Sequence, residues 1–270
     1  MSAPASLELQ TVRKVFFAGT ANEVVALGGI DLLVPAGQFV TIIGSNGSGK
    51  STLLNAVAGT FPLTSGHVLL DGADVTKQRE YQRSRVIGRV FQDPRAGTAP
   101  GMTIEENLAI SFRRNTRSGL RLGVTNHRRA AMREKLAPLG MGLEGRLKAQ
   151  VNKLSGGQRQ AMSLLMATES EPSLLLLDEH TAALDPKVAA TIMELTGVMV
   201  AERDLTTLMV THNMELALRY GDRLIMMHSG RVVLDLDAGL KSTLQVSDLV
   251  EKFHEVAGEA FAVDRILLGT

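Results

Sequence analysis

The sequence predicts an α/β fold that begins with an antiparallel β layer and carries a helical insertion. Three observations predict it. Apolar and polar residues alternate in Leu7–Val15 and Val24–Val34, as in strands that bury one face. Beyond residue 155, helical and strand-like segments follow each other in turn, which is typical of a mostly parallel sheet covered by helices. Between these parts, residues 103–151 have a helical pattern broken by glycines.

The first half of the chain contains short apolar runs bounded by turn residues. A turn at Ala18–Asn22 separates the first two strands. The expected elements that follow are a buried strand at Phe39–Ile43, a helix at Thr52–Ala58, a strand at Val68–Leu70 that ends in the turn Asp71-Gly72, and a strand at Val86–Phe91. The helical pattern of residues 103–151 has breaks at Gly119, at Gly123 and from Gly140 to Gly145.

The sequence pattern of the second half predicts helices and strands that alternate along the chain. The expected order is helix Gln158–Thr168, strand Leu174–Leu177, helix Pro186–Glu202, strand Thr206–Val210 and helix Met214–Tyr220. The last residues, including Val250–Ala260, have an amphipathic pattern and are too few for a regulatory domain of full size.

Composition narrows the possible functions. The 270 residues are 44% hydrophobic, which is enough for one large or two modest cores. The formal net charge of +1 gives no argument for nucleic acid or an anionic membrane as a partner. The absence of cysteine excludes disulfides, metal–thiolate sites and a cysteine nucleophile.

No secretory signal is visible in residues 1–10, and the longest apolar runs are far shorter than the ~20 residues that span a bilayer. We therefore expect the chain to stay on the side of the membrane where it is made, and a membrane function would require another subunit. The strongest local charge bias is a set of arginines: Arg113, Arg114, Arg117, Arg121, Arg128, Arg129 and Arg133. They predict either a solvated helical surface or a contact with a partner or lipid headgroups.

A glycine-rich segment follows the buried strand at Phe39–Ile43. It reads Gly44-Ser45-Asn46-Gly47-Ser48-Gly49-Lys50-Ser51, which matches the phosphate-loop pattern. Glycines allow backbone N–H groups to wrap a polyphosphate, and the helix that follows points its N-terminus at the charge. Lys50 would reach the β- and γ-phosphates and Ser51 would ligate Mg²⁺. An ordinary glycine-rich turn between strand and helix is the alternative.

Two carboxylates follow the apolar run Leu174–Leu177. Strand ends of open α/β sheets face the ligand crevice. There Asp178 would hold Mg²⁺, directly or through water, and Glu179 would polarise the attacking water. The alternative is that this pair merely caps a helix.

With these motifs the chain resembles the nucleotide-binding subunit of an ABC transporter. Order and spacing agree from about residue 7 to 235. The matching segments are Gly44–Ser51 as Walker A, Gln92 as Q-loop, Leu154–Gln158 as signature, Leu174–Glu179 as Walker B, Ala183–Asp185 as D-loop and His212 as switch histidine, with Phe16 where the family has an aromatic that stacks on adenine. In isolation, Gln92, His212 and Phe16 could be a turn residue, a helix-start residue and a core aromatic.

The resemblance implies the cofactors ATP and Mg²⁺ and a role for each matched residue. Glu179, His212, Gln92 and Lys50 would be catalytic, and Ser51, Gln92 and Asp178 would hold the metal. ATP would be bound by Phe16, by Gly44, Ser45, Asn46, Gly47, Ser48, Gly49, Lys50, Ser51 and Thr52, and by Ser155, Gly156, Gly157, Gln158 and Asp185. The signature serine and glycines would form a second γ-phosphate cradle that serves the opposite subunit.

The resemblance also implies a P-loop NTPase core with an antiparallel β subdomain and an inserted α-helical subdomain. The implied boundaries are about 1–40 and 60–85 for the antiparallel subdomain, 41–59, 86–95 and 152–235 for a RecA-like core, 96–151 for the helical subdomain and 236–270 for a tail. The implied partners are a second copy of the chain in a head-to-tail dimer on ATP, permease subunits that contact the helical subdomain and, indirectly, a solute-binding protein. No nucleic acid is expected.

The implied location is the cytoplasmic face of the inner (plasma) membrane, held there through the permease. The chain is similar to a subgroup of importers, which suggests a small, amino-acid-like solute. A soluble ABC ATPase in cytosolic assembly or a nucleic-acid process is the alternative. One residue departs from the family, because His180 stands where proline usually follows the Walker B glutamate. We expect His180 to be tolerated rather than catalytic, and His180→Pro to keep most of the ATPase rate.

Overall fold

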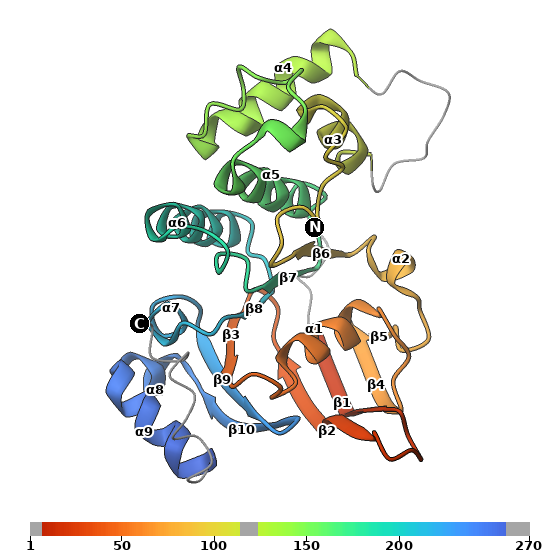
Figure 1. Cartoon of the computed structure of the whole chain (residues 1–270), viewed down its shortest axis with the longest axis vertical. Coiled ribbons are helices and arrows are strands. Elements are labelled where there is room, and N and C mark those ends of the chain that lie inside the picture. The colour runs from red at the N-terminus through yellow and green to blue at the C-terminus, as the bar shows by residue number, and fades with distance from the viewer. Residues whose placement is uncertain (1–6, 114–123, 258–270) are drawn as a thin grey trace. The chain divides into compact units, whose positions relative to one another are not determined.

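The computed structural model describes residues 7–113 and 124–257. The chain divides into two compact units, one formed by residues up to Ser84 and from Asp204 onward, the other by Arg85–Arg203. Figure 1 labels their helices and strands. No helix among the described residues is long and apolar enough to cross a membrane.

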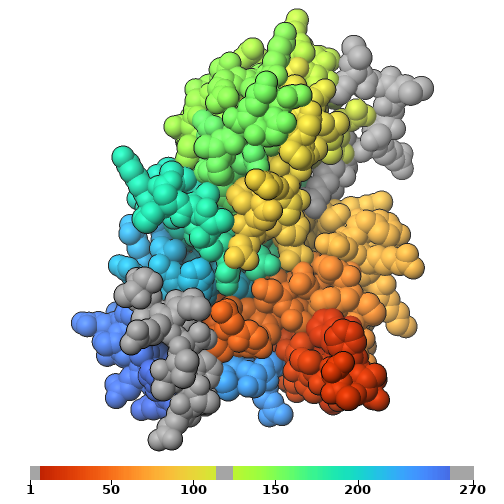
Figure 2. Space-filling view, in the orientation of Figure 1, coloured from red at the N-terminus to blue at the C-terminus, as the bar shows by residue number. Residues whose placement is uncertain are grey.

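The first unit contains an antiparallel sheet with strand order β2-β1-β4-β5 (Figure 1). Its strands are β1 (Leu7–Phe16), β2 (Val24–Val34), β4 (Ser65–Leu70) and β5 (Ala73–Asp74). Leu7, Leu9 and Val12 are buried on one face of β1, as the alternation predicts. The β1–β2 turn is exposed and lies in the red part of Figure 2. The predicted first two strands and their turn are confirmed.

The same unit contains parallel strands that position the glycine-rich loop. β3 (Phe39–Gly44) is buried throughout and pairs in parallel with β8 (Thr207–Val210) and with β9 (Arg223–His228). β10 (Arg231–Leu236) runs antiparallel to β9. Helix α1 (Lys50–Ala58) begins two residues before the predicted start, at the loop itself. The hairpin β9–β10 and the short helix α2 (Glu80–Arg83) had no counterpart in the sequence prediction.

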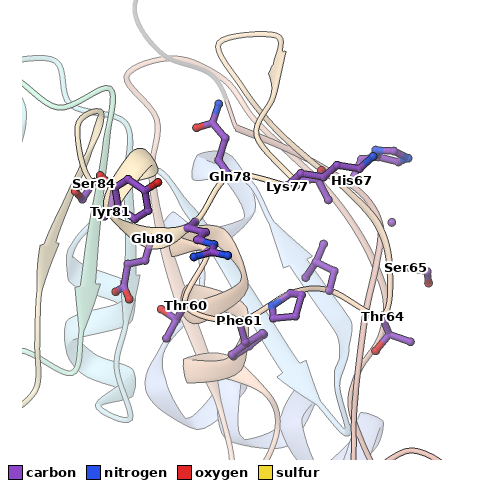
Figure 3. A pocket seen from close by; sticks show the side chains of 16 residues that line it. Thr60, Phe61, Thr64, Ser65, His67, Lys77, Gln78, Glu80, Tyr81 and Ser84 are labelled. Atoms are coloured by element: carbon purple, nitrogen blue, oxygen red, sulfur yellow. Dashed lines mark hydrogen bonds between the residues drawn. The ribbon is translucent and has the colours of Figure 1, made fainter.

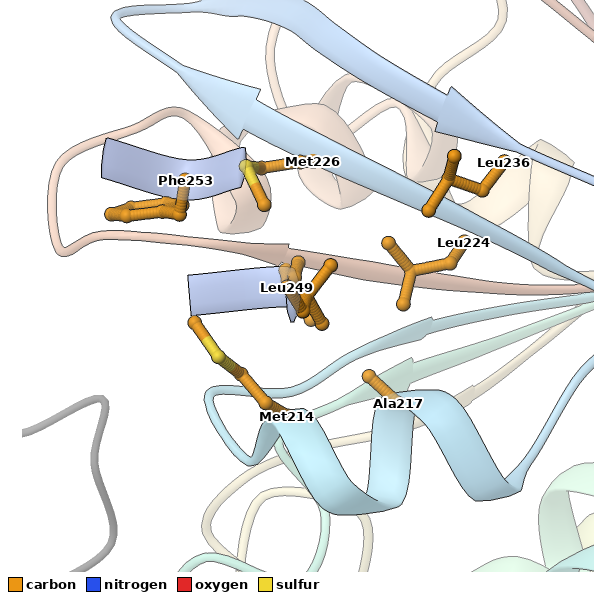
Figure 4. Close-up of a cluster of buried hydrophobic side chains, with 8 residues drawn as sticks. Met214, Ala217, Leu224, Met226, Leu236, Leu249 and Phe253 are labelled. Carbon is orange, nitrogen blue, oxygen red and sulfur yellow. The ribbon is translucent and has the colours of Figure 1, made fainter. Parts of the chain in front are cut away.

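The C-terminal helices pack on the same core (Figure 4). They are α7 (Met214–Arg219), α8 (Ala238–Ser242) and α9 (Val246–Ala257). Leu249 and Phe253 of α9 join Met214, Leu224 and Met226 in one buried cluster. The predicted amphipathic tail is therefore helical at Val246–Ala257, and this helix is part of the hydrophobic core of this unit. Residues 258–270 lie outside the described part.

The second unit combines two parallel strands with helices. The strands are β6 (Ile87–Val90) and β7 (Leu174–Asp178). The α-helices are α3 (Ile104–Ser111), α4 (Asn126–Leu136), α5 (Gly156–Thr168) and α6 (Pro186–Glu202), with 3₁₀ turns at Ala137–Leu139 and Val151–Lys153. Thr103 and Glu106 begin α3 with a capping box. Gly119 and Gly123 lie outside the described residues.

One arginine of the predicted basic cluster holds two helices together. Arg129 of α4 makes a bidentate ion pair with Glu105 of α3, with Nε–Oε2 and Nη2–Oε1 distances of 2.8 and 3.1 Å. This hydrogen-bonded guanidinium lowers the pKa of Glu105. Arg129 therefore has a structural partner, whereas Arg114, Arg117 and Arg121 lie outside the described residues.

A buried arginine fixes the C-terminal end of α1. Arg83 is 1% exposed, and its Nη1 donates to the carbonyls of Ala56 and Val57 at 2.9 and 2.7 Å. Its Nη2 and Nε donate to the carbonyls of Thr76 and Gln78 at 2.9 and 3.1 Å. Burial lowers the pKa of Arg83. The guanidinium thus adds donors for carbonyls of the helix end and of the next loop.

We expect Arg83→Met to lower the free energy of unfolding by about 3 kcal/mol, because it removes a buried guanidinium that donates to two buried and two part-buried carbonyls. The matched control is Arg85→Met, at an exposed arginine two residues away, which should change stability by less than about 0.5 kcal/mol. Urea unfolding followed by circular dichroism measures both. Equal midpoints for the two variants would show that the Arg83 network is not stabilising.

Candidate functional site

The glycine-rich loop adopts a backbone that only glycine fits at two positions. Gly44 has φ 151°, and a Cβ there would overlap the carbonyl oxygen of Met227. Gly49 has φ 102°, and a Cβ would lie 2.6 Å from the carbonyl oxygen of Ala26. At the tip, Asn46 and Gly47 are exposed and a Cβ on Gly47 would meet nothing within 4 Å. The loop is therefore tight at both ends and open at its tip.

Helix α1 begins without a side-chain cap. Its N-cap is Gly49, which offers no acceptor, and its first turn carries no acidic residue. The helices α3, α5 and α6 are instead capped by Thr103, Ser155 and Asp185. The positive dipole end of α1 is therefore not offset by a capping side chain or an acidic residue of its own first turn, and it favours an anion. The loop therefore fits a polyphosphate.

Lys50 already lies across this loop. Its side chain is 6% exposed, and Nζ donates to the carbonyls of Gly44 and Ser45 at 2.7 and 2.9 Å. A phosphate would compete with those carbonyls for the ammonium protons. Ser45 and Ser48 are also buried, whereas Ser51 is exposed and Thr52 half-buried at the start of the helix. The Ser51 hydroxyl is therefore accessible to a cation.

Two further predicted residues belong to the same unit. Phe16 is half-buried at the end of β1, and its ring meets that of Phe61 edge to face with centroids 5.4 Å apart. Lys14 Nζ lies 4.8 and 4.7 Å from the centroids of these two rings. His212 is half-buried after β8, directly before the α7 cap Asn213. The two rings form an apolar surface with the Lys14 ammonium beside them, and purines stack on aromatic surfaces of this kind.

A pocket of about 1130 Å³ also lies in this unit (Figure 3). Phe61, Thr64 and His67 line it from the segment after α1, and Lys77, Glu80 and Tyr81 line it from the segment around α2. None of its lining residues was predicted to bind nucleotide or metal. The pocket adjoins the predicted nucleotide site at Phe61, whose ring contacts that of Phe16.

The second unit holds the carboxylates. Asp178 ends β7, and Arg89 on the neighbouring strand β6 places Nη2 3.3 Å from Asp178 Oδ2, with both side chains mostly buried. The Arg89 guanidinium also lies 4.6 Å from the ring centroid of Phe91. Gln92 follows directly and is exposed. The sequence analysis missed Arg89, because its position beside Asp178 depends on the pairing of β6 with β7.

Signature residues begin helix α5. Ser155 Oγ accepts from the backbone N–H of Gln158, and Gln158 Oε1 accepts from that of Ser155, both at 3.2 Å. Ser155 and Gly156 are exposed, and Gly157 is buried. This helix start therefore offers a hydroxyl and backbone groups to solvent or to a partner. Farther along, Gln160 Nε2 donates to the carbonyl of Phe91 at 3.2 Å, next to Gln92.

The D-loop packs on the signature glycines within the second unit. Asp185 caps α6 by accepting from the N–H of Val188 at 3.1 Å. A Cβ on Gly156 would lie 3.3 Å from Leu184 Cδ2, and a Cβ on Gly157 would overlap Val188 Cγ1. The sequence analysis explained these glycines by their N–H groups alone. The structure adds a steric reason, which is the close approach of α6.

We expect Gly157→Ala to lower ATP turnover about tenfold, because the added Cβ must displace Val188 and the start of α6. Alanine keeps the N–H group, so the variant separates packing from anion binding. Val188→Ala should restore turnover in the double variant by removing the overlapping methyl group. Steady-state ATPase assays compare the three variants with the parent chain. Unchanged turnover in the single variant, or no recovery in the double one, would contradict this explanation.

Each unit thus gathers part of the predicted site. The first unit holds Phe16, the loop Gly44–Ser51, Thr52 and His212. The second holds Gln92, Ser155–Gln158, Asp178, Glu179 and Asp185. The roles of these residues remain predictions.

Comparisons with known proteins bear on family and fold. A family model described as ABC transporter matches residues 27–182. The chain is 47% identical over 218 residues to a tyrosine transport ATP-binding protein of Clostridioides difficile (strain R20291), covering 81% of this chain and 86% of that protein. It is 37% identical over 222 residues to the phosphonates import ATP-binding protein PhnC of Frankia casuarinae, covering 81% of this chain and 87% of that protein.

Solved structures give the same result for the fold. A dimeric ATP-binding cassette in a post-hydrolysis state bound to ADP and Pi matches with a TM-score of 0.74 and 30% identity, covering 86% of this chain and 98% of that one. The ADP conformation of another ATP-binding cassette, from an ABC transporter, matches with a TM-score of 0.74 and 26% identity, covering 92% and 98%. The predicted α/β fold class, a P-loop NTPase core with an antiparallel β layer and added helices, is confirmed.

Proposed function

The chain belongs to the family of ATP-binding subunits of ABC transporters, and from this membership we propose that it is the ATPase of an importer for an amino acid. One observation carries the ATP-binding part: the loop Gly44–Ser51 ends at a helix whose N-terminus has no cap of its own. The alternative, a soluble ABC ATPase in assembly or nucleic-acid processes, has no particular feature of the structure in its favour.

In the proposed mechanism the loop residues bind and orient ATP. Backbone N–H groups from Gly47 to Ser51 surround the phosphates, and Lys50 moves from the carbonyls of Gly44 and Ser45 to the β- and γ-phosphates. Phe16 stacks on adenine. Mg²⁺, when bound, neutralises charge on the phosphates, and Ser51, Asp178 and Gln92 are the residues that would hold it.

Glu179 and His212 act on the attacking water and the γ-phosphate in this proposal. The Glu179 carboxylate accepts a hydrogen bond from the water and orients it for in-line attack. His212 donates to a γ-phosphate oxygen. Gln92 lies between the metal and residues 96–151, which we propose as the contact with the permease. Binding of the γ-phosphate would in this way be communicated to the membrane subunits.

The proposed dimer places Ser155, Gly156, Gly157, Gln158 and Asp185 of one subunit against ATP on the other. The exposure of Ser155, Gly156 and Asp185 supports this, because their polar groups face outward at two helix starts. The resemblance to a dimeric cassette bound to ADP and Pi supports it as well. We further propose a peripheral position on the cytoplasmic face of the membrane, and a separate solute-binding protein as an indirect partner.

The relative named for tyrosine transport, to which the chain is 47% identical, supports the proposed solute class. The test is co-expression with candidate permease subunits from the same genome, followed by reconstitution in proteoliposomes with a candidate solute-binding protein. We expect co-purification and ATP hydrolysis stimulated severalfold by tyrosine, with methionine and a phosphonate as comparison solutes. Co-purification without stimulation by any amino acid would refute the solute class. Failure of the chain to bind any permease would refute the importer and favour the soluble alternative.

A further inference from the structure

The segment after the strand β7 is a pair of tight turns that begins at Glu179. The carbonyl of Glu179 accepts from the N–H of Ala182 at 2.9 Å, and the carbonyl of Thr181 accepts from that of Leu184 at 3.2 Å. Glu179 itself has φ 43°, in the left-handed region, which costs a residue with a Cβ about 1 kcal/mol. Surrounding contacts must therefore hold this backbone.

His180 supplies one such contact. It is 2% exposed, and its Nε2 lies 3.1 Å from Oγ1 of Thr196, a fully buried residue of α6. Thr196 Oγ1 also donates to the carbonyl of Ile192 at 2.8 Å. Since a hydroxyl has one hydrogen and that hydrogen is used, the oxygen accepts from His180 and the ring carries its proton on Nε2.

The contact is a hydrogen bond between two buried side chains. Its donor is assigned from the Thr196 hydroxyl, whose single hydrogen goes to the carbonyl of Ile192. Burial also lowers the pKa of His180 to about 4.

We propose that His180 is a positioning residue for ATP hydrolysis, whose hydrogen bond to Thr196 anchors the turn that carries Glu179 to helix α6. The inference rests on the proposed role of Glu179 as the residue that orients water. In this chain the anchor restricts the turn, and a carboxylate that orients water must be held within a fraction of an ångström of its working position. Proline, which restricts the backbone but has no donor, could not make this contact.

Helix α6, which contains Thr196, also begins directly after the D-loop residue Asp185. Asp185 caps α6 and Val188 lies against Gly157, so α6 joins the turn after Glu179 to the signature helix. Thr196 lies about three turns beyond Asp185 along α6 and is buried with Ile192 and Met193. The His180–Thr196 pair therefore fixes the turn to the element that also positions the signature.

The central test uses Thr196, because its substitution leaves the sequence around Glu179 intact. Thr196→Val removes the hydroxyl with little change in volume, and we expect kcat for ATP to fall about tenfold with KM unchanged. Thr196→Ser keeps the hydroxyl and should retain most of kcat. The matched control is Thr191→Val: Thr191 also donates to a carbonyl four residues earlier on α6, that of Lys187 at 3.2 Å, but contacts no histidine in the described structure. It should leave kcat unchanged.

Histidine variants complete a double-mutant cycle. His180→Leu should lower kcat as Thr196→Val does, the double variant should be no slower than either single one, and His180→Gln, whose amide can donate, should recover part of the rate. Thermal unfolding of each variant identifies any that are not folded at the assay temperature. If His180→Leu is not folded, the comparison of Thr196→Val with Thr196→Ser decides the test. Parent-like kcat in Thr196→Val, equal loss in Thr191→Val, or additive losses would overturn the proposal. If the proposed role of Glu179 were wrong, Glu179→Gln would retain turnover, so this outcome can be told apart from a failure of the His180–Thr196 proposal.

Discussion

Glu179→Gln is expected to keep ATP binding and to lower turnover by a factor of about 100 or more. The amide occupies the same volume but cannot accept a proton from the attacking water. Proton transfer to a positioned side chain accelerates a reaction roughly 10²–10⁴-fold. The substitution leaves Lys50 and the glycine-rich loop Gly44–Ser51 in the sequence, and these are the residues proposed to bind the phosphates. Binding and chemistry should therefore separate, and the ATP-bound dimer should accumulate.

The measurement combines ATP hydrolysis, nucleotide binding by equilibrium dialysis and dimer formation by light scattering with and without ATP. Glu194→Gln is a matched control, because it makes the same change at an exposed glutamate of α6. It should leave all three quantities unchanged. Turnover within a few-fold of the parent in Glu179→Gln would remove Glu179 from the proposed role.

The elements and motifs of this chain could be predicted where local pattern decides structure. The alternation in β1 and β2, the helix Pro186–Glu202 and the strand before Asp178 depend on periodicity and cap residues, and the structure has them at or near the predicted bounds. Helix α5 begins at Gly156, two residues before its predicted start, because Ser155 caps it and two glycines count as helical. Sequence propensity discounts glycine in a helix, whereas packing against α6 requires it there.

Other features depend on contacts between residues far apart in the chain. The hairpin β9–β10 was not predicted because its apolar run Leu224–Met227 is short and was considered only as a membrane segment. Arg83 and Arg89 resemble ordinary surface arginines in the sequence. Only the fold shows that the Arg83 guanidinium donates to backbone carbonyls and that Arg89 forms an ion pair with Asp178.

His180 shows the limit of reasoning from residue type. The sequence analysis considered whether its ring titrates and expected tolerance of proline, an expectation that is untested. The structure shows two effects of proline at this position. Proline would remove the hydrogen bond to Thr196, and it restricts the backbone of the preceding residue, Glu179, which has φ 43°. The ATPase rate of His180→Pro therefore reports the loss of this hydrogen bond and the backbone change together, whereas the Thr196 variants change the hydrogen bond alone.

The second large effect concerns Ser155, which we expect to act in trans. Lys50→Ala should weaken ATP binding by removing the ammonium that lies across the loop. Ser155→Arg should block the exposed signature. In a mixed dimer of these two chains, one site combines both lesions and the other combines the intact loop of one chain with the intact signature of its partner.

Differently tagged chains, both also carrying Glu179→Gln to stabilise the closed state, allow the mixed dimer to be isolated in the presence of ATP. We expect ATP-dependent dimers in the mixture and almost none with either variant alone, because each homodimer has the same lesion in both sites. If Ser155 instead served the loop of its own chain, every site would carry one lesion and mixing would gain nothing. ATP-dependent association of the mixture no greater than that of either variant alone would therefore refute the proposed head-to-tail dimer, provided that mixing two unlesioned Glu179→Gln chains yields dimers under the same conditions.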